Sequence, residues 1–169
     1  MTSLANLKIG FIGGGNMASA LIGGLIKQGA QANNIFVADP FDQTRQRLER
    51  DLSIICAASV DKLASHIENC DVLVMAVKPQ QFKEAASELA LVLKSLASKP
   101  LCLSVAAGIK TSDMAKWLGH PRIIRAMPNT PALIGEGMTG LFADAHISAA
   151  DQSLASSICE AVRLLYCVQ

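Results

Sequence analysis

The stretch that decides the fold is Lys8-Ile9-Gly10-Phe11-Ile12-Gly13-Gly14-Gly15-Asn16-Met17-Ala18. An apolar run ends in three consecutive glycines and an amphipathic segment starts directly after them, which predicts a strand, a tight turn and the opening of a helix. Gly13, Gly15 and Ala18 match the G-x-G-x-x-G/A pattern of dinucleotide-binding turns. In that pattern the first glycine permits the sharp turn, the second lets a pyrophosphate approach the backbone, and the last small residue lets the helix pack on the strand. The alternative is a glycine-rich turn that only permits close packing of helix and strand.

Length and composition indicate one domain with a substantial core. Of 169 residues, 51% are hydrophobic and 17% are charged, which suits a sheet covered on both faces. The net charge is +1 without a basic run, so we expect neither nucleic acid nor a membrane as a partner. The longest apolar stretch, residues 17–26, is shorter than the roughly 20 residues of a membrane span, and we expect a cytoplasmic protein. Five scattered cysteines and three widely spaced histidines predict reduced thiols and no metal site.

Strand-like and helix-like segments alternate along the chain, which predicts an α/β fold of the Rossmann type. We expect a doubly wound, mainly parallel sheet with helices on both faces, as one domain over residues 1–169. After the strand that ends at residue 12, the expected strands are 35–38, 53–56, 72–77, 101–105, 122–127 and 137–143, and the expected helices are 16–28, 42–51, 59–68, 81–96, 111–118 and 148–165. Candidate helix caps are Ser59, Thr111 or Ser112, and Ser148 at the starts, and Gly29 and Gly119 after the ends.

The carboxyl ends of these strands carry the candidate cofactor-binding residues, because ligands of such sheets bind beyond those ends. Asp39 follows Ala18 by 21 positions, near the ~20-residue offset of the acid that hydrogen-bonds the adenosine ribose, which favours NAD(H). The alternative is that Asp39 only caps the next helix. Arg45 and Arg47 on that helix would reach a 2′-phosphate, but we interpret them as part of a solvated face.

Lys78 precedes a proline at the end of the most apolar strand, where the backbone of residues 76–78 would line the cofactor cleft. The alternative is a simple break between strand and helix. Small side chains at 106–108 leave room for a cofactor ring. The full set of candidate cofactor-binding residues is Gly13, Gly14, Gly15, Asn16, Met17, Asp39, Ala76, Val77, Lys78, Pro79, Ala106, Ala107 and Gly108.

The segment from residue 122 to 140, with Pro128-Asn129-Thr130-Pro131 at its centre, resembles the most specific signature in the N-terminal half of pyrroline-5-carboxylate reductases. Blocks at 10–18, 76–80 and 103–108 resemble the family's other motifs, in the same order. The resemblance implies an oxidoreductase of proline biosynthesis that reduces pyrroline-5-carboxylate to proline with NADPH or NADH. It favours NADP(H), whereas Asp39 leaves NAD(H) open. We place Asn129 and Thr130 on the nicotinamide or substrate side, the alternative being that their loop is only a rigid turn.

The resemblance also implies a second, helical domain beyond these residues, which forms a dimer and supplies most of the substrate site. We expect that domain to be absent from this chain and the full-length protein to be a homo-oligomer through it. No residue here is assigned as catalytic or as a metal ligand. Two other functions stay open at this point: a nucleotide-sensing module without turnover, and a methyltransferase that uses S-adenosylmethionine, which also has a glycine turn after its first strand.

Overall fold

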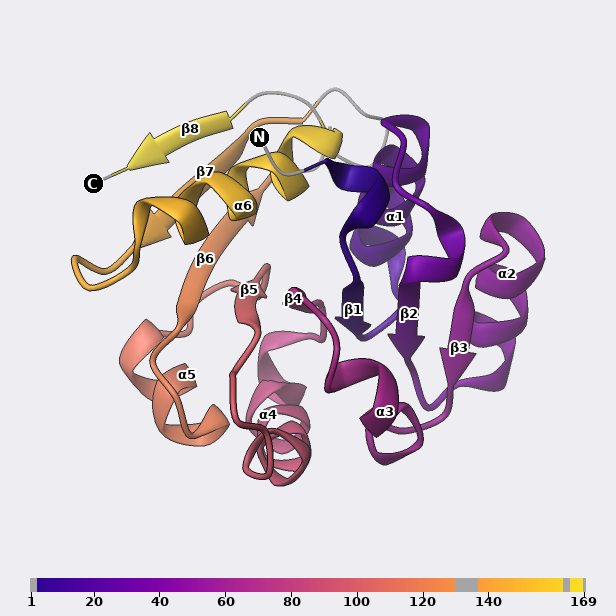
Figure 1. Ribbon diagram of the computed structural model, residues 1–169, viewed down its shortest axis with the longest axis horizontal. Helices are drawn as coiled ribbons and strands as arrows, with labels where there is room; N and C mark the ends of the chain where they lie inside the picture. Colours follow the sequence, from indigo (N-terminus) through magenta and orange to yellow (C-terminus); the bar gives the residue numbers. More distant parts are fainter. Residues whose placement is uncertain (1–2, 130–136, 163–164, 169) are drawn as a thin grey trace.

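The fold is a three-layer α/β sandwich built on one twisted sheet (Figure 1). The computed structural model describes residues 3–129, 137–162 and 165–168. Within those ranges eight strands pair in the order β3-β2-β1-β4-β5-β6-β7-β8. The first six in chain order are parallel to one another, β7 runs antiparallel to β6, and β8 runs parallel to β7. The predicted doubly wound, mainly parallel sheet is therefore confirmed.

Strands and helices alternate as far as β6. The strands are β1 Ile9–Ile12, β2 Ile35–Ala38, β3 Ile55–Ala57, β4 Val72–Met75, β5 Leu101–Ser104, β6 Ile123–Pro128, β7 Thr139–Ala143 and β8 Leu165–Val168. The helices are α1 Asn16–Lys27, α2 Asp42–Leu52, α3 Ala64–Ile67, α4 Pro79–Leu93, α5 Thr111–Leu118 and α6 Ala149–Cys159. Short 3₁₀ helices lie at Leu4–Asn6, Ala32–Asn34, Asp61–Leu63 and Glu160–Val162.

Each face of the sheet has its own hydrophobic core. On one face α1, α2 and α6 cover the sheet, with Leu21, Leu48 and Ile158 buried against alternate strand residues such as Val74. On the other face lie α3, α4 and α5, which bury Phe82 and its neighbours against the remaining strand residues. Figure 1 shows α3, α4 and α5 below the sheet and α1 and α6 above it. Because both faces are covered, the central strands β1, β4 and β5 are buried along their whole length, as their continuous apolar sequence predicts.

The predicted termini of several helices are correct. Gly29 and Gly119 follow their helices with φ of +104° and +78°, and Ser148 Oγ accepts a hydrogen bond from the Asp151 backbone N–H at 3.1 Å. The predicted cap at Thr111 or Ser112 is wrong, because α5 begins at Thr111 and Lys110 occupies the cap position without a side-chain bond.

Three predicted boundaries need correction. Helix 59–68 is reduced to a 3₁₀ turn and the four residues of α3, with Ser59 bonding the Asp61 side chain instead of capping a long helix. Helix 81–96 begins earlier, at Pro79, because the fixed φ of proline suits the first helical position. Helix 148–165 ends at Cys159, and Leu165–Val168 forms β8 on the free edge of β7. A four-residue apolar run fits either structure locally, and the open strand edge decides between them.

No helix within the described ranges is long and apolar enough to cross a membrane.

Candidate cofactor-binding site

The glycine turn joins β1 to α1 at the switch point of the sheet, where β2 and β4 flank β1. Gly13 has a φ of +96°, and a Cβ on it would lie 2.7 Å from the Ala76 carbonyl oxygen, so only glycine fits. Gly15 is the N-cap of α1, is exposed, and a Cβ on it would meet nothing within 4 Å. The turn thus presents an open stretch of backbone at the positive end of a helix, which suits a phosphate group.

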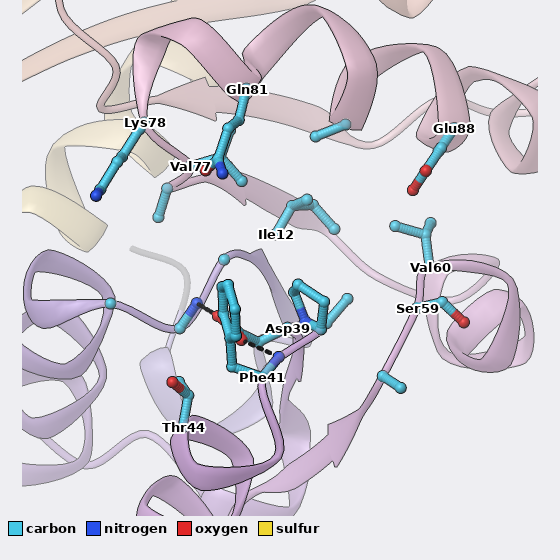
Figure 2. A pocket seen from close by; sticks show the side chains of 18 of the residues that line it. Ile12, Asp39, Phe41, Thr44, Ser59, Val60, Val77, Lys78, Gln81 and Glu88 are labelled. Carbon is cyan, nitrogen blue, oxygen red and sulfur yellow. Dashed lines mark hydrogen bonds between the residues drawn. The ribbon is translucent and has the colours of Figure 1, made fainter.

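A cavity of about 550 Å³ opens beyond the carboxyl ends of β1, β2 and β4. Figure 2 shows Val77, Lys78 and Gln81 on the wall formed by the start of α4, and Asp39, Phe41 and Thr44 on the opposite wall. Ser59 and Val60 line it from the loop after β3. The space therefore extends from the glycine turn between two walls that come from different βα units, as an elongated nucleotide requires.

Charge is unevenly distributed along this cavity. Lys78 and Glu88 stand at opposite ends of it in Figure 2. Phe41, which is 65% exposed, lies between these ends, and Val60 lies beside Glu88. A ligand with phosphates near Lys78 and a flat apolar ring near Phe41 matches this arrangement.

Asp39 is buried beside the glycine turn and binds two backbone amides. Its Oδ2 accepts a hydrogen bond from the Gly14 N–H at 2.8 Å, and its Oδ1 accepts one from the Phe41 N–H at 2.9 Å. The N-cap of α2 is Phe41, so the alternative in which Asp39 caps that helix is wrong. Asp39 lines the cavity, and each carboxylate oxygen has a further lone pair that can accept a hydrogen bond.

Arg45 and Arg47 are not the solvated face that the sequence indicated. The Arg45 side chain is only 18% exposed, and its Nη1 donates to the Asp39 carbonyl oxygen at 2.8 Å. Arg47 Nη2 lies 3.2 Å from both the Gly14 carbonyl oxygen and Ser19 Oγ. Neither arginine lines the cavity. Arg47 is therefore directed to the glycine turn, whereas Arg45 binds the backbone after β2 and pairs with Asp42 at 3.0 Å.

The cavity unites seven of the thirteen candidate cofactor residues. It is lined by Gly13, Gly14, Gly15, Asp39, Ala76, Val77 and Lys78. The other six, Asn16, Met17, Pro79, Ala106, Ala107 and Gly108, lie outside its lining. Asn16 and Pro79 are the first residues of α1 and α4, directly next to lining residues, and 106–108 follow β5 at the same edge of the sheet. The structure adds lining residues that the sequence did not assign to the cofactor site, among them Pro40, Phe41, Thr44, Ser59, Val60, Gln81, Glu84 and Glu88.

Asn129 lies apart from this cavity, at the end of β6. Its side-chain Oδ1 accepts from the Met138 N–H at 2.8 Å, and its own N–H donates to the Met138 carbonyl oxygen at 3.1 Å. These two bonds join the residue before β7 to the end of β6, which gives Asn129 a structural role. Thr130 lies outside the described residues.

The cysteines and histidines of the described ranges are not grouped as metal ligands. Cys102 Sγ and His120 Nε2 are 3.4 Å apart in the buried core under α5. Burial raises the pKa of the Cys102 thiol to about 12 and lowers the pKa of His120. The pair is therefore neutral and unreactive at physiological pH.

The sequence matches one family over most of its length. Residues 8–108 match the family described as NADP oxidoreductase coenzyme F420-dependent. The chain belongs to this family. It is 42% identical over 156 residues to the pyrroline-5-carboxylate reductase of Pseudomonas aeruginosa, which covers 92% of this chain and 55% of that relative.

Solved structures of reductases show the same architecture. A pyrroline-5-carboxylate reductase from Coxiella burnetii superposes with a TM-score of 0.87 at 37% identity, over 96% of this chain and 59% of that one. The Plasmodium falciparum pyrroline carboxylate reductase, solved with NADP bound, superposes with a TM-score of 0.79 at 26% identity, over 98% of this chain and 58% of that one. The resemblance inferred from the sequence motifs is thereby confirmed. The chain spans about half the length of the curated relatives it matches.

Proposed function

We propose that the cavity beyond β1, β2 and β4 binds NAD(P)H, and that the chain forms the cofactor half of a pyrroline-5-carboxylate reductase. The observation that carries the proposal is the open backbone of Gly15 at the N-terminus of α1, facing a cavity of about 550 Å³. The family's relatives named pyrroline-5-carboxylate reductase support the same reading.

The residues of the cavity fit the parts of a dinucleotide. The pyrophosphate would meet the free N–H groups at the start of α1 and the ammonium of Lys78. The adenosine ribose would lie at Asp39, and the adenine between Phe41 and Val60. The nicotinamide would extend past the ends of β4 and β5 toward residues 106–108 and Asn129, where small side chains leave room.

The chemistry that the cofactor supplies is hydride transfer, here to the C=N bond of 1-pyrroline-5-carboxylate to give L-proline. The contribution of these residues is to orient the dinucleotide and to hold its phosphates. None of them is positioned as a general acid for the ring nitrogen. We propose that contacts to the substrate come from the part of the relatives' length that these 169 residues do not match, and that the same part forms a homo-oligomer.

Two further parts of the proposal concern cofactor preference and compartment. NADP(H) is favoured by the NADP-bound relative, while the Asp39 carboxylate and the absence of arginine from the described cavity lining leave NAD(H) open. A cytoplasmic, reducing location is supported by the free thiols of Cys56, Cys70 and Cys102.

Calorimetric titration of the chain with NADPH, NADH and S-adenosylmethionine tests the binding proposal. We expect the nicotinamide cofactors to bind and S-adenosylmethionine not to bind; the reverse result contradicts it. The reductase proposal is tested by NADPH absorbance with the imine present. We expect the 169-residue chain to bind cofactor without measurable turnover and the protein of the relatives' length to turn over. Binding without turnover by that longer protein would indicate a nucleotide-sensing module.

A further inference from the structure

Three consecutive peptide groups of the glycine turn are each held by a different side chain. The first, between Gly13 and Gly14, has its N–H bonded to Asp39 Oδ2 at 2.8 Å in a buried contact. The second, between Gly14 and Gly15, has its carbonyl oxygen 3.2 Å from Arg47 Nη2. The third, between Gly15 and Asn16, has its carbonyl oxygen bonded by the N–H of Ser19 at 2.9 Å and by the Ser19 hydroxyl at 3.0 Å.

The orientation of these peptide groups decides what the turn offers a ligand. In a trans peptide the N–H points opposite to the C=O. When Arg47 binds the carbonyl of Gly14, the N–H of Gly15 is directed away from α2, on the side where Gly15 is exposed. If this peptide turned over, a carbonyl oxygen would face the phosphate and repel it. Peptides next to glycine turn over readily because no Cβ restricts φ and ψ.

Arg47 is well placed to prevent that rotation. It lies on α2, 33 residues after Gly14, next to Leu48, which is 1% exposed in the core. The backbone of Gly14 packs directly on this helix, since a Cβ there would lie 2.7 Å from Leu48 Cδ1. Arg47 Nη2 also lies 3.2 Å from Ser19 Oγ, the hydroxyl that holds the third peptide. The guanidinium of Arg47 therefore contacts the Gly14 carbonyl oxygen directly and the next peptide through the Ser19 hydroxyl on α1.

We propose that Arg47 is a positioning residue of the cofactor site: it holds the Gly14–Gly15 peptide so that the Gly15 N–H faces the pyrophosphate. This inference rests on the proposed NAD(P)H site. It adds a role that the cavity lining does not reveal, because Arg47 binds the turn on the α2 side and does not line the cavity. It differs from the role usually expected of an arginine after β2, contact with a 2′-phosphate. A 2′-phosphate contact would matter for NADPH alone, whereas the orientation of the Gly15 N–H matters equally for NADH and NADPH.

The test compares Arg47→Met, which keeps most of the aliphatic stem, with Arg47→Lys and with a matched control, Arg50→Met. Arg50 lies on the same helix with its side chain 74% exposed and pairs with Asp51, so the control removes the same charge without touching the turn. Dissociation constants for NADH and NADPH are measured by calorimetry. We expect Arg47→Met to weaken the binding of both cofactors by about tenfold, which corresponds to the loss of one part-buried hydrogen bond. Arg47→Lys should recover part of the loss, and Arg50→Met should stay within about twofold of the unmodified chain.

The second readout is the ¹⁵N–¹H resonance of Gly15 without cofactor. We expect it to shift or broaden in Arg47→Met, to return toward its original position in Arg47→Lys, and to stay unchanged in Arg50→Met. Weakening confined to NADPH, or an unmoved Gly15 resonance in Arg47→Met, would overturn the proposal. If the unmodified chain bound neither cofactor, the proposed function would fail, and the Gly15 resonance would still decide whether Arg47 holds the peptide.

Discussion

Replacing Gly15 by valine should abolish cofactor binding while leaving the fold intact. A Cβ at Gly15 meets no atom within 4 Å, and the residue has a φ of −70°, which valine adopts without strain. The expected cost to folding is the poorer N-cap, about 1 kcal/mol or less. The added side chain instead fills the space that a pyrophosphate needs. The loss of two charge-assisted hydrogen bonds from backbone N–H groups to the pyrophosphate, at about 1.5 kcal/mol each, weakens cofactor binding by roughly 100-fold or more.

The assay pairs calorimetry with NADPH and NADH with thermal unfolding. Gly23→Val, on the same helix with open space around its Cβ position, is the matched control and should bind cofactor normally. Gly13→Ala is the contrasting variant, because it forces alanine to a φ of +96° and against the Ala76 carbonyl oxygen. It should lower the unfolding midpoint by the equivalent of about 1–3 kcal/mol. Cofactor affinity of Gly15→Val within about threefold of the unmodified chain would refute the reasoning.

Three further predictions concern other parts of the molecule. Asp39→Ser should weaken NADH binding and shift the ratio of the NADH and NADPH dissociation constants toward NADPH by about 1–2 kcal/mol, because the substitution removes a negative charge beside the adenosine ribose. An unchanged ratio would show that Asp39 serves only to bind the Gly14 and Phe41 amides. Arg122 binds Asp151 through two bonds of 2.6 and 3.0 Å and lowers the pKa of that carboxyl below its ordinary value of 3.8. The ion pair therefore stabilises the fold above pH 3.8, and this stabilisation is lost as the pH falls through the lowered pKa of Asp151. The difference in melting temperature between the unmodified chain and Asp151→Asn should disappear in acid. A difference that did not depend on pH would contradict this. The thiol of Cys102 should resist iodoacetamide at neutral pH until the chain unfolds, because its pKa is raised to about 12; modification of the native protein, seen by peptide mass spectrometry, would count against it.

The sequence by itself determined the features that depend on neighbouring residues. The run from Lys8 to Ala18 specified strand, turn and helix, because an apolar run, three glycines and an amphipathic segment follow one another directly. Alternation of apolar strands with amphipathic helices specified the parallel sheet, and hence the edge where the ligand binds. The reductase motifs added the family. Each of these signals is made by residues that are neighbours in the sequence, so the sequence displays it directly.

Only the tertiary structure decided which side chains meet at that edge. The contacts of Asp39 and Arg47 with Gly14 span 25 and 33 residues, and no local pattern records them. The polar sequence of α2 is the same whether Arg47 faces solvent or the glycine turn, and packing of Leu48 on Gly14 selects the second arrangement. Likewise Leu165–Val168 becomes a strand because β7 offers it a free edge. The physical reason is common to all three: the partner that satisfies each polar group or strand edge comes close only after the βα units have packed together.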